Sequence, residues 1–169
     1  YAAQVPDDFR FCQKVWEEIT VPAYANLPRY GAKAGKPNPR FLDAGVFRDL
    51  VLQPALEGLG AKLGPFMFEF QRWGLEPSVF LTQLDRFLDQ LPSGPAYAVE
   101  VRNPAILNQR YRDILQAHGV AHVYNHWTSM PPLSDQHQTL TGTFTAPFTV
   151  LRLLTPLGLA YEQAVERYA

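Results

Sequence analysis

The sequence predicts an α/β fold in which helices cover a parallel β-sheet, and two observations support this class. Segments that are apolar on both faces of a strand, such as residues 66–70 and 97–101, alternate with amphipathic helical segments such as residues 77–91. Strands of this kind are typical of parallel sheets. The expected strands also end in polar or charged residues, which a barrel gathers at one rim. We therefore favour a parallel barrel over an open doubly wound sheet.

The N-terminal third predicts one strand, one loop and one helix. Residues 9–15 alternate between two faces, which indicates a strand that ends near Lys14. Residues 20–39 are rich in proline and glycine, and they predict a long loop. Apolar residues recur at helical spacing over residues 43–59, and Gly60 is a natural stop for that helix.

The central third predicts two strands and two helices. The apolar run over residues 66–70 predicts the second strand, and residues 97–101 predict the third. Between them, one apolar stripe over residues 77–91 indicates an amphipathic helix. Another helix is expected over residues 108–117, where His118 is placed to cap its C-terminus.

The last third predicts two more strands. They are expected over residues 120–124 and 148–154, with a loop over residues 128–143 between them and a final helix over residues 161–168. Neither G-x-G-x-x-G nor G-x-x-x-x-G-K-[ST] occurs in the sequence. Nucleotide binding of the open-sheet kind is therefore disfavoured, and we expect no cofactor.

The composition indicates one domain with a sizeable core, since 47% of the 169 residues are hydrophobic. The net charge of −1 and the lack of a basic block argue against nucleic-acid binding. The apolar runs are too short to span a bilayer. A single cysteine, Cys12, excludes an intrachain disulfide and favours a cytoplasmic location. The oligomeric state is left open, and so is any targeting segment, because the sequence begins at Tyr1.

The charged ends of the strands are the strongest functional signal. Glu100 and Arg102 are two residues apart, so they share one face of an extended strand. Glu69 is enclosed by phenylalanines, where an unpaired carboxylate is costly. Arg152 ends another apolar strand, and Lys14 ends the first strand on a face that we expect to be buried. These residues can equally be structural ion pairs, but we favour a shared site.

Polar residues that follow the strands are weaker candidates. Asn103 comes directly after Arg102, and His126 lies beyond the fourth strand, so both are assigned to substrate binding at the rim. His122, Tyr124 and His126 alternate on one face of the expected strand, a pattern that suggests metal ligation, but no third ligand at diagnostic spacing is present. We therefore expect no metal site.

The same part of the sequence resembles a known family. Residues 9–15, 59–65 and 97–104, followed by residues 118–121 and 150–153, resemble in order the motifs of the YecE-like family, also called domain of unknown function 72. The resemblance covers most of the chain. It implies a barrel of parallel strands ringed by helices, of the triosephosphate-isomerase type.

The resemblance also implies that the barrel is partial. Family members begin with two further strand units before the segment that matches residues 9–15, and they finish with one more strand after Arg152. About five of the eight strand units of a closed barrel are therefore expected here. We accordingly interpret residues 1–169 as a single domain, the central and C-terminal part of such a barrel, incomplete at both ends.

The chain departs from the commoner family pattern at the rim. Many members have Gln where Glu69 stands, His where Asn103 stands, Asp near His126, and His-Gly where Leu154-Thr155 stands. The chain resembles instead a subgroup with Phe-Glu-Phe-Gln and Arg-Asn-Pro in these places. Because the differences change the acids, bases and hydrogen-bond donors of the rim, the family does not define the reaction.

Two functions fit this rim, and whether the chain is an enzyme is left open. In the first, Glu69 and Glu100 supply acid–base catalysis in a metal-independent hydrolase or lyase. A small phosphorylated or carboxylated substrate is then held by neighbouring cations and polar groups, namely Lys14, Arg102, Arg152, Asn103 and His126. In the second, the same rim binds an anionic ligand or partner without catalysis.

Overall fold

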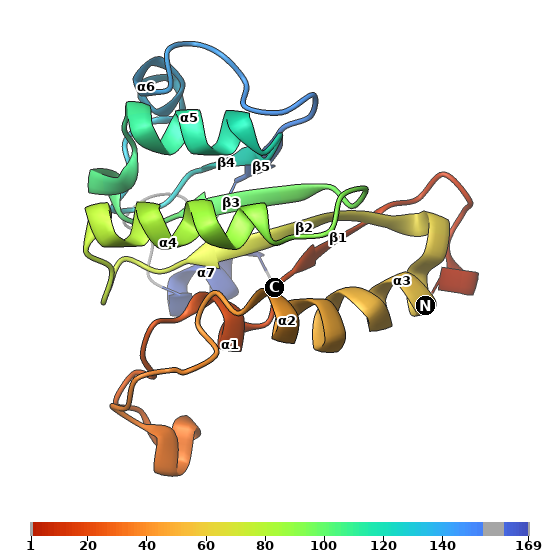
Figure 1. Ribbon diagram of the computed structural model, residues 1–169, viewed down its shortest axis with the longest axis horizontal. Helices are drawn as coiled ribbons and strands as arrows, with labels where there is room; N and C mark the ends of the chain where they lie inside the picture. The colour runs from red at the N-terminus through yellow and green to blue at the C-terminus, as the bar shows by residue number, and fades with distance from the viewer. Residues whose placement is uncertain (1, 154–160, 169) are drawn as a thin grey trace.

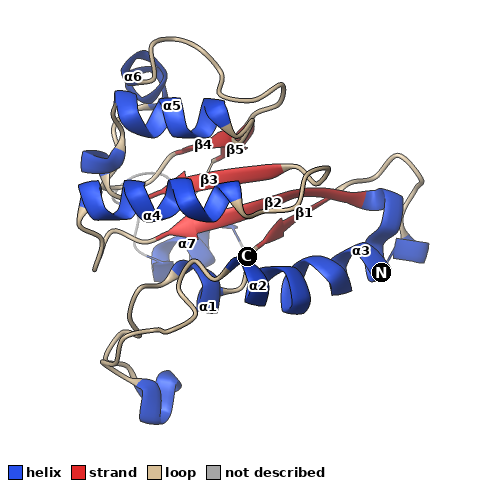
Figure 2. Ribbon diagram, in the orientation of Figure 1, coloured by secondary structure: helices blue, strands red, loops and turns tan. Residues whose placement is uncertain are grey.

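The computed structural model describes residues 2–153 and 161–168, in which helices pack against a parallel sheet (Figures 1 and 2). The sheet has five strands in the order β1-β2-β3-β4-β5, and it is curled like half of a barrel. The strands are β1 Phe11–Lys14, β2 Leu63–Phe70, β3 Tyr97–Val101, β4 Ala121–Asn125 and β5 Val150–Arg152. The predicted parallel α/β architecture is confirmed, whereas closure into a barrel of the triosephosphate-isomerase type stays a prediction.

Helices occupy each connection between consecutive strands. The α-helices are α1 Glu17–Thr20, α2 Ala44–Phe47, α3 Gln53–Leu59, α4 Pro77–Asp89, α5 Gln109–Ala117, α6 Leu133–Thr139 and α7 Tyr161–Tyr168. A π-helical turn, Arg48–Leu52, joins α2 to α3, so the helix predicted over residues 43–59 is nearly continuous. Short 3-10 turns cover Ala2–Gln4, Pro28–Lys33, Gly60–Lys62 and Pro104–Ile106.

Local polar contacts fix where several helices begin and end. Asp43 Oδ1 accepts a hydrogen bond from the Val46 N–H over 2.9 Å at the start of α2. Asn108 Oδ1 accepts one from the Tyr111 N–H over 3.0 Å at the start of α5. Such caps satisfy backbone donors that have no partner within the helix. Gly119 follows α5 with a φ of 63°, a conformation that glycine adopts at little cost.

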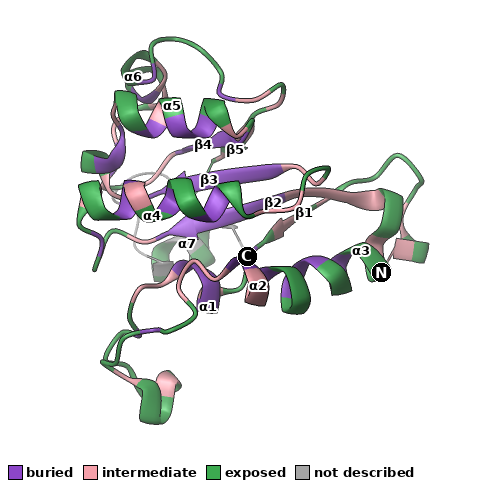
Figure 3. Cartoon of the chain, viewed as in Figure 1, coloured by how far each residue is buried: buried purple, intermediate pink, exposed green. Residues whose placement is uncertain are grey.

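The outer face of the sheet carries the main hydrophobic core. Phe66, Phe68 and Phe70 alternate onto this face of β2 and are fully buried. The Phe68 ring centroid lies 5.1 Å from that of Phe47 in α2 and 5.2 Å from that of Phe87 in α4. Figure 3 shows the central strands in purple beneath helices whose outward sides are green. Most of the apolar stripe predicted for the helix between β2 and β3 therefore faces the sheet, whereas Val79, which the prediction included, is exposed.

The inner face of the sheet is layered along the strands. Near the amino ends lies a small apolar cluster, Met67, Ala98, Ala121 and Val123, with Phe148 and Val150 packed against it. Side chains two residues further along a strand share the same face. The strand register places Glu69 beside Glu100 and Asn125 beside Arg152. Polar and charged residues therefore gather on the inner face at the carboxyl edge of the sheet.

The connection between β4 and β5 differs from its prediction. The loop predicted over residues 128–143 is wrong, because it contains α6. Gln136 Nε2 in this helix donates to the carbonyls of Asn125 and Pro131, both over 2.8 Å. A helix held by polar tertiary contacts shows no apolar periodicity in the sequence. The strand predicted over residues 148–154 is shorter, and residue 154 lies outside the described residues.

The proline-rich segment projects from the body of the molecule, as its orange trace in Figure 1 shows, and we call residues 21–40 the projecting loop. Its base is fixed by a buried network. Tyr24 Oη donates to Glu18 Oε2 over 2.6 Å, and Asn38 Nδ2 donates to the carbonyls of Glu18 and Val21 over 2.7 and 2.8 Å. The predicted loop is thus confirmed, with a 3-10 turn added near its tip.

Candidate functional site

Five charged side chains meet on the inner face at the carboxyl edge of the sheet, and we call them the rim cluster. Glu69 comes from β2 and Glu100 from β3, while Lys14 ends β1, Arg102 follows β3 and Arg152 ends β5. The sequence predicted each of them as a rim residue. The structure joins all five into one network of ion pairs.

Glu69 is the most heavily bonded member of the rim cluster. Its Oε1 accepts from Lys14 Nζ over 3.0 Å and from Gln71 Nε2 over 2.6 Å. Its Oε2 accepts from Arg102 Nη2 over 2.8 Å and from Arg152 Nη1 over 2.5 Å. Both carboxylate oxygens are therefore doubly hydrogen-bonded, as a buried charge requires. The contact from Gln71 was not predicted from the sequence.

Glu100 shares its two arginines with Glu69. Arg102 Nε donates to Glu100 Oε1 over 3.0 Å, so these two residues do share a face as the sequence predicted. Arg152 Nη1 also donates to Glu100 Oε2 in a short contact. One guanidinium nitrogen of Arg152 thus lies between two carboxylates. Such charge-assisted bonds are about twice as strong as neutral ones.

The surroundings keep Glu69 ionised. Burial alone raises the pKa of Glu69, but the hydrogen bond from Arg152 and the charges of Arg102 and Lys14 outweigh it, and the pKa falls below its usual range. Burial has the opposite effect on a cation and lowers the pKa of Arg152. The hydrogen bonds that Arg152 makes to Glu100 and Glu69 outweigh burial, so the pKa of Arg152 is raised overall. Three cations against two carboxylates leave the rim cluster with one excess positive charge.

Arg102 is held between the carboxylates and an aromatic ring. Its guanidinium carbon lies 4.1 Å from the centroid of the Trp127 ring, a cation–π contact. We infer that Arg102 positions the two carboxylates rather than contacting solvent.

On the same edge, Asn125 Nδ2 donates to the Val101 carbonyl over 3.0 Å, while its buried Oδ1 meets no donor within the described part of the chain.

Lys14 and Arg152 are the accessible members of the rim cluster. The Lys14 side chain is 52% exposed, so the burial predicted for it is wrong. Lys14 belongs to the edge strand β1, which has a neighbour on one side within the described chain, and this explains its exposure. The Arg152 side chain is 26% exposed. These two cations can therefore reach a ligand without displacing the buried core of the cluster.

A cleft opens beside this accessible side. It has a volume of about 400 Å³, within the usual range for small-molecule sites. Of the rim cluster, Lys14 and Glu69 line it, together with Gln71, whereas Glu100, Arg102 and Arg152 do not. The projecting loop and Trp73 form much of its wall, including Leu27, Arg29 and Tyr30. The sequence did not predict this cleft, because it depends on how the projecting loop lies over the ends of β1 and β2.

Two predicted substrate-binding residues are not part of the ion-pair network. Asn103 Oδ1 accepts from the Ala105 N–H over 3.1 Å and so caps the turn after β3. The backbone N–H of His126 donates to the Arg152 carbonyl over 3.0 Å, which fixes the ends of β4 and β5 against each other. Both residues stand at the carboxyl edge, and the contacts recorded for them are structural.

His122 points to the outer face and is buried there. Its Nδ1 lies 3.0 Å from the Tyr111 hydroxyl, and its Nε2 lies 3.3 Å from Gln136 Oε1. Burial lowers the pKa of His122 to about 4, so the ring is neutral near pH 7. Residues 2–153 and 161–168 contain no group of three His, Cys, Asp or Glu side chains placed to hold a metal ion.

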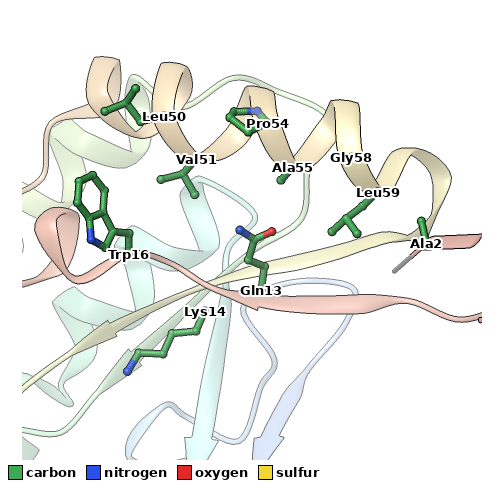
Figure 4. Close-up of a pocket in the computed structure, with 10 residues that line it drawn as sticks. All are labelled: Ala2, Gln13, Lys14, Trp16, Leu50, Val51, Pro54, Ala55, Gly58 and Leu59. Atoms are coloured by element: carbon green, nitrogen blue, oxygen red, sulfur yellow. The ribbon is translucent and has the colours of Figure 1, made fainter. Parts of the chain in front are cut away.

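A second cavity lies between β1 on one side and the π-helical turn Arg48–Leu52 and α3 on the other (Figure 4). Its volume is about 470 Å³, and its lining is largely apolar, with Trp16, Leu50 and Val51 among the lining residues. In Figure 4 the Lys14 side chain extends away from the helices. Lys14 lines both this cavity and the cleft, whereas Glu69 lines the cleft alone.

The fold and the rim cluster define a class of protein: an α/β chain whose parallel half-barrel carries ion-paired charges at the carboxyl edge of its strands. Residues 1–168 match the model of a family described as Protein of unknown function DUF72. The chain belongs to this family, as its motifs predicted. No curated protein and no solved structure matches it. Among the described helices, none has the length and apolar character needed to cross a membrane.

Proposed function

We propose that the rim cluster and the adjoining cleft bind a small phosphorylated or carboxylated molecule and catalyse hydrolase- or lyase-type chemistry on it. The excess positive charge of the cluster, carried on the accessible side chains of Lys14 and Arg152, is the observation that supports this most directly. An anionic group bound there balances the charge. Lys14 also lines the cleft, which gives the rest of the ligand a place to lie.

The proposed roles follow from the contacts. Arg152 directs Nη1 at both carboxylates and, among the described residues, its other guanidinium nitrogens meet no acceptor, so they are available to an anion. Glu69 is ionised near neutral pH, so it is able to accept a proton from substrate or water, although its lowered pKa makes it a weak base. Glu100 is the second carboxylate within reach of the same guanidinium nitrogen. Arg102 holds both in place.

Binding is tested first, with inorganic phosphate and sulfate as probes. We expect either anion to raise the melting temperature and phosphate affinity to fall by about tenfold or more in Arg152→Met, the loss expected for a hydrogen bond to a charged group. Arg152→Lys keeps the positive charge but lacks the planar guanidinium that can donate two parallel hydrogen bonds, so it should bind phosphate with intermediate affinity. Arg86→Met, an exposed cation on α4, is the matched control and should bind like wild type. No stabilisation by phosphate or sulfate would end the anion-binding proposal.

Catalysis is tested with phosphate esters and carboxylated compounds as candidate substrates. Glu69→Gln and Glu100→Gln should each lower turnover by about 10²–10⁴-fold, the range usual for loss of a general acid or base. Phosphate affinity should remain measurable in both variants, because the cations stay in place. Turnover by Glu100→Gln at the wild-type rate would contradict its catalytic role.

A second candidate is binding without turnover, and the saturation of Glu69 favours it. Both oxygens of this carboxylate already accept two hydrogen bonds, so its lone pairs are occupied in the free protein. In this case Arg102→Ala weakens phosphate binding, and none of the candidate substrates is consumed by wild type. Consumption of any of them that depends on Glu69 would exclude this second candidate.

A further inference from the structure

The cleft contains two aromatic side chains that the proposed function does not use. Trp73, in the loop after β2, lines the cleft and is 75% exposed. Tyr30, from the projecting loop, lines it as well, and its hydroxyl donates to Glu17 Oε2 over 3.1 Å. The Arg72 guanidinium carbon lies 5.3 Å from the Trp73 ring centroid, a cation–π contact, and most of the remaining indole surface is open to a ligand.

Cations and hydrogen-bonding groups accompany these rings. Lys14 and Arg29 bring positive charge to the cleft from β1 and from the projecting loop. Glu17 brings a carboxylate that can accept hydrogen bonds from hydroxyl groups, and Gln71 brings an amide oxygen that can accept them, since its nitrogen already donates to Glu69. The side chains that line the cleft therefore match a ligand with an anionic group, several hydroxyls and a face that can lie on an aromatic ring.

We propose that the cleft binds a phosphorylated monosaccharide, an inference that rests on the proposed function because the phosphate is the anion held near Lys14. The C–H face of a sugar ring lies against the negative face of an aromatic ring, which Trp73 supplies. The hydroxyls of the sugar donate to the carboxylate of Glu17. The volume of about 400 Å³ lies near the lower end of small-molecule sites, which favours one sugar ring with its phosphate over a nucleotide.

The test is calorimetric titration of the whole chain with inorganic phosphate, glucose, glucose 6-phosphate and ribose 5-phosphate. At least one sugar phosphate should bind about tenfold more tightly than inorganic phosphate, which corresponds to about 1.4 kcal/mol. Trp73→Ala should lower the affinity for that sugar phosphate to the level of inorganic phosphate and leave the affinity for inorganic phosphate unchanged. Trp16→Ala removes an exposed indole that lines the other cavity, so it is the matched control and should change neither affinity.

The outcomes separate this inference from the proposed function. If wild type does not bind inorganic phosphate, the proposed function fails and the sugar assignment fails with it. If phosphate binds but neither sugar phosphate binds more tightly, or if Trp73→Ala changes nothing, the sugar assignment alone is overturned. Tighter binding of adenosine monophosphate than of both sugar phosphates, lost in Trp73→Ala, also overturns it and assigns a nucleotide to the cleft.

Discussion

The two faces of strand β2 are buried to a similar extent, but different interactions hold them. On the outer face, Phe66, Phe68 and Phe70 are fully buried among apolar side chains. On the inner face, Glu69 is 3% exposed and accepts four hydrogen bonds. Apolar burial is non-directional and scales with area, whereas a buried carboxylate depends on each of its partners. Substitutions on the two faces should therefore differ in pH dependence as well as in size.

The largest effect is expected on the outer face. Phe68→Ala removes a ring that packs against Phe47 and Phe87, and the cavity should cost about 3–5 kcal/mol of the free energy of unfolding. Urea denaturation followed by circular dichroism measures this loss, which should be the same at pH 5 as at pH 7. Val79→Ala, at an exposed position on α4, should cost less than about 0.5 kcal/mol. Equal costs for the two variants would mean that the outer face is not the main core.

A smaller effect is expected when one cation is removed from the inner face. Arg102→Met leaves two buried carboxylates with fewer partners, and it should cost about 3 kcal/mol. Lys14→Met also removes an ion pair to Glu69, but its side chain is half exposed, so it should cost about 0–1 kcal/mol. The same denaturation experiment compares them. A cost for Lys14→Met as large as that for Arg102→Met would show that burial does not set the strength of these pairs.

The smallest effect is a change in pH dependence. The pKa of Glu69 is lower in the folded than in the unfolded chain, so the unfolded state binds more protons at acidic pH. This contribution to stability is present above the unfolded pKa of about 4.3 and is lost as pH falls through the folded pKa. The stability difference between wild type and Glu69→Gln should therefore shrink as pH falls from 7 to 3 in urea titrations. A difference that grows on acidification would contradict the direction of the pKa shift.

Strand periodicity made most of the rim cluster predictable. Glu69, Glu100 and Arg102 could be placed on one face because side chains alternate along a strand, and Arg152 could be added because parallel strands end at one edge. The structure brings these residues into direct contact. The charges of these residues, their positions along the strands and the family motifs are all local features of the sequence. Local reasoning was therefore sufficient to predict this part of the rim cluster.

Contacts that come from loops could not be predicted in this way. Trp127, beyond the end of β4, stacks on Arg102, which follows β3, so this contact depends on how the two strand ends meet. The helix α6 is held through the buried Gln136, whose side-chain bonds leave no apolar pattern. The exposure of Lys14 depends on its edge strand rather than on its own neighbours in the sequence. The cleft also depends on tertiary structure, because residues of the projecting loop form much of its lining.

Arg152 also has a consequence for the order in which the protein folds. From β5 it bonds Glu69 in β2, which is 83 residues earlier in the sequence and three strands away in the sheet. Until β5 docks, Glu69 and Glu100 lack one of their partners and remain costly to bury. Contacts this distant in sequence form late and slow the search for the native state. The docking of β5 therefore gives both carboxylates their remaining partner and, in the same step, gives the rim cluster its excess positive charge.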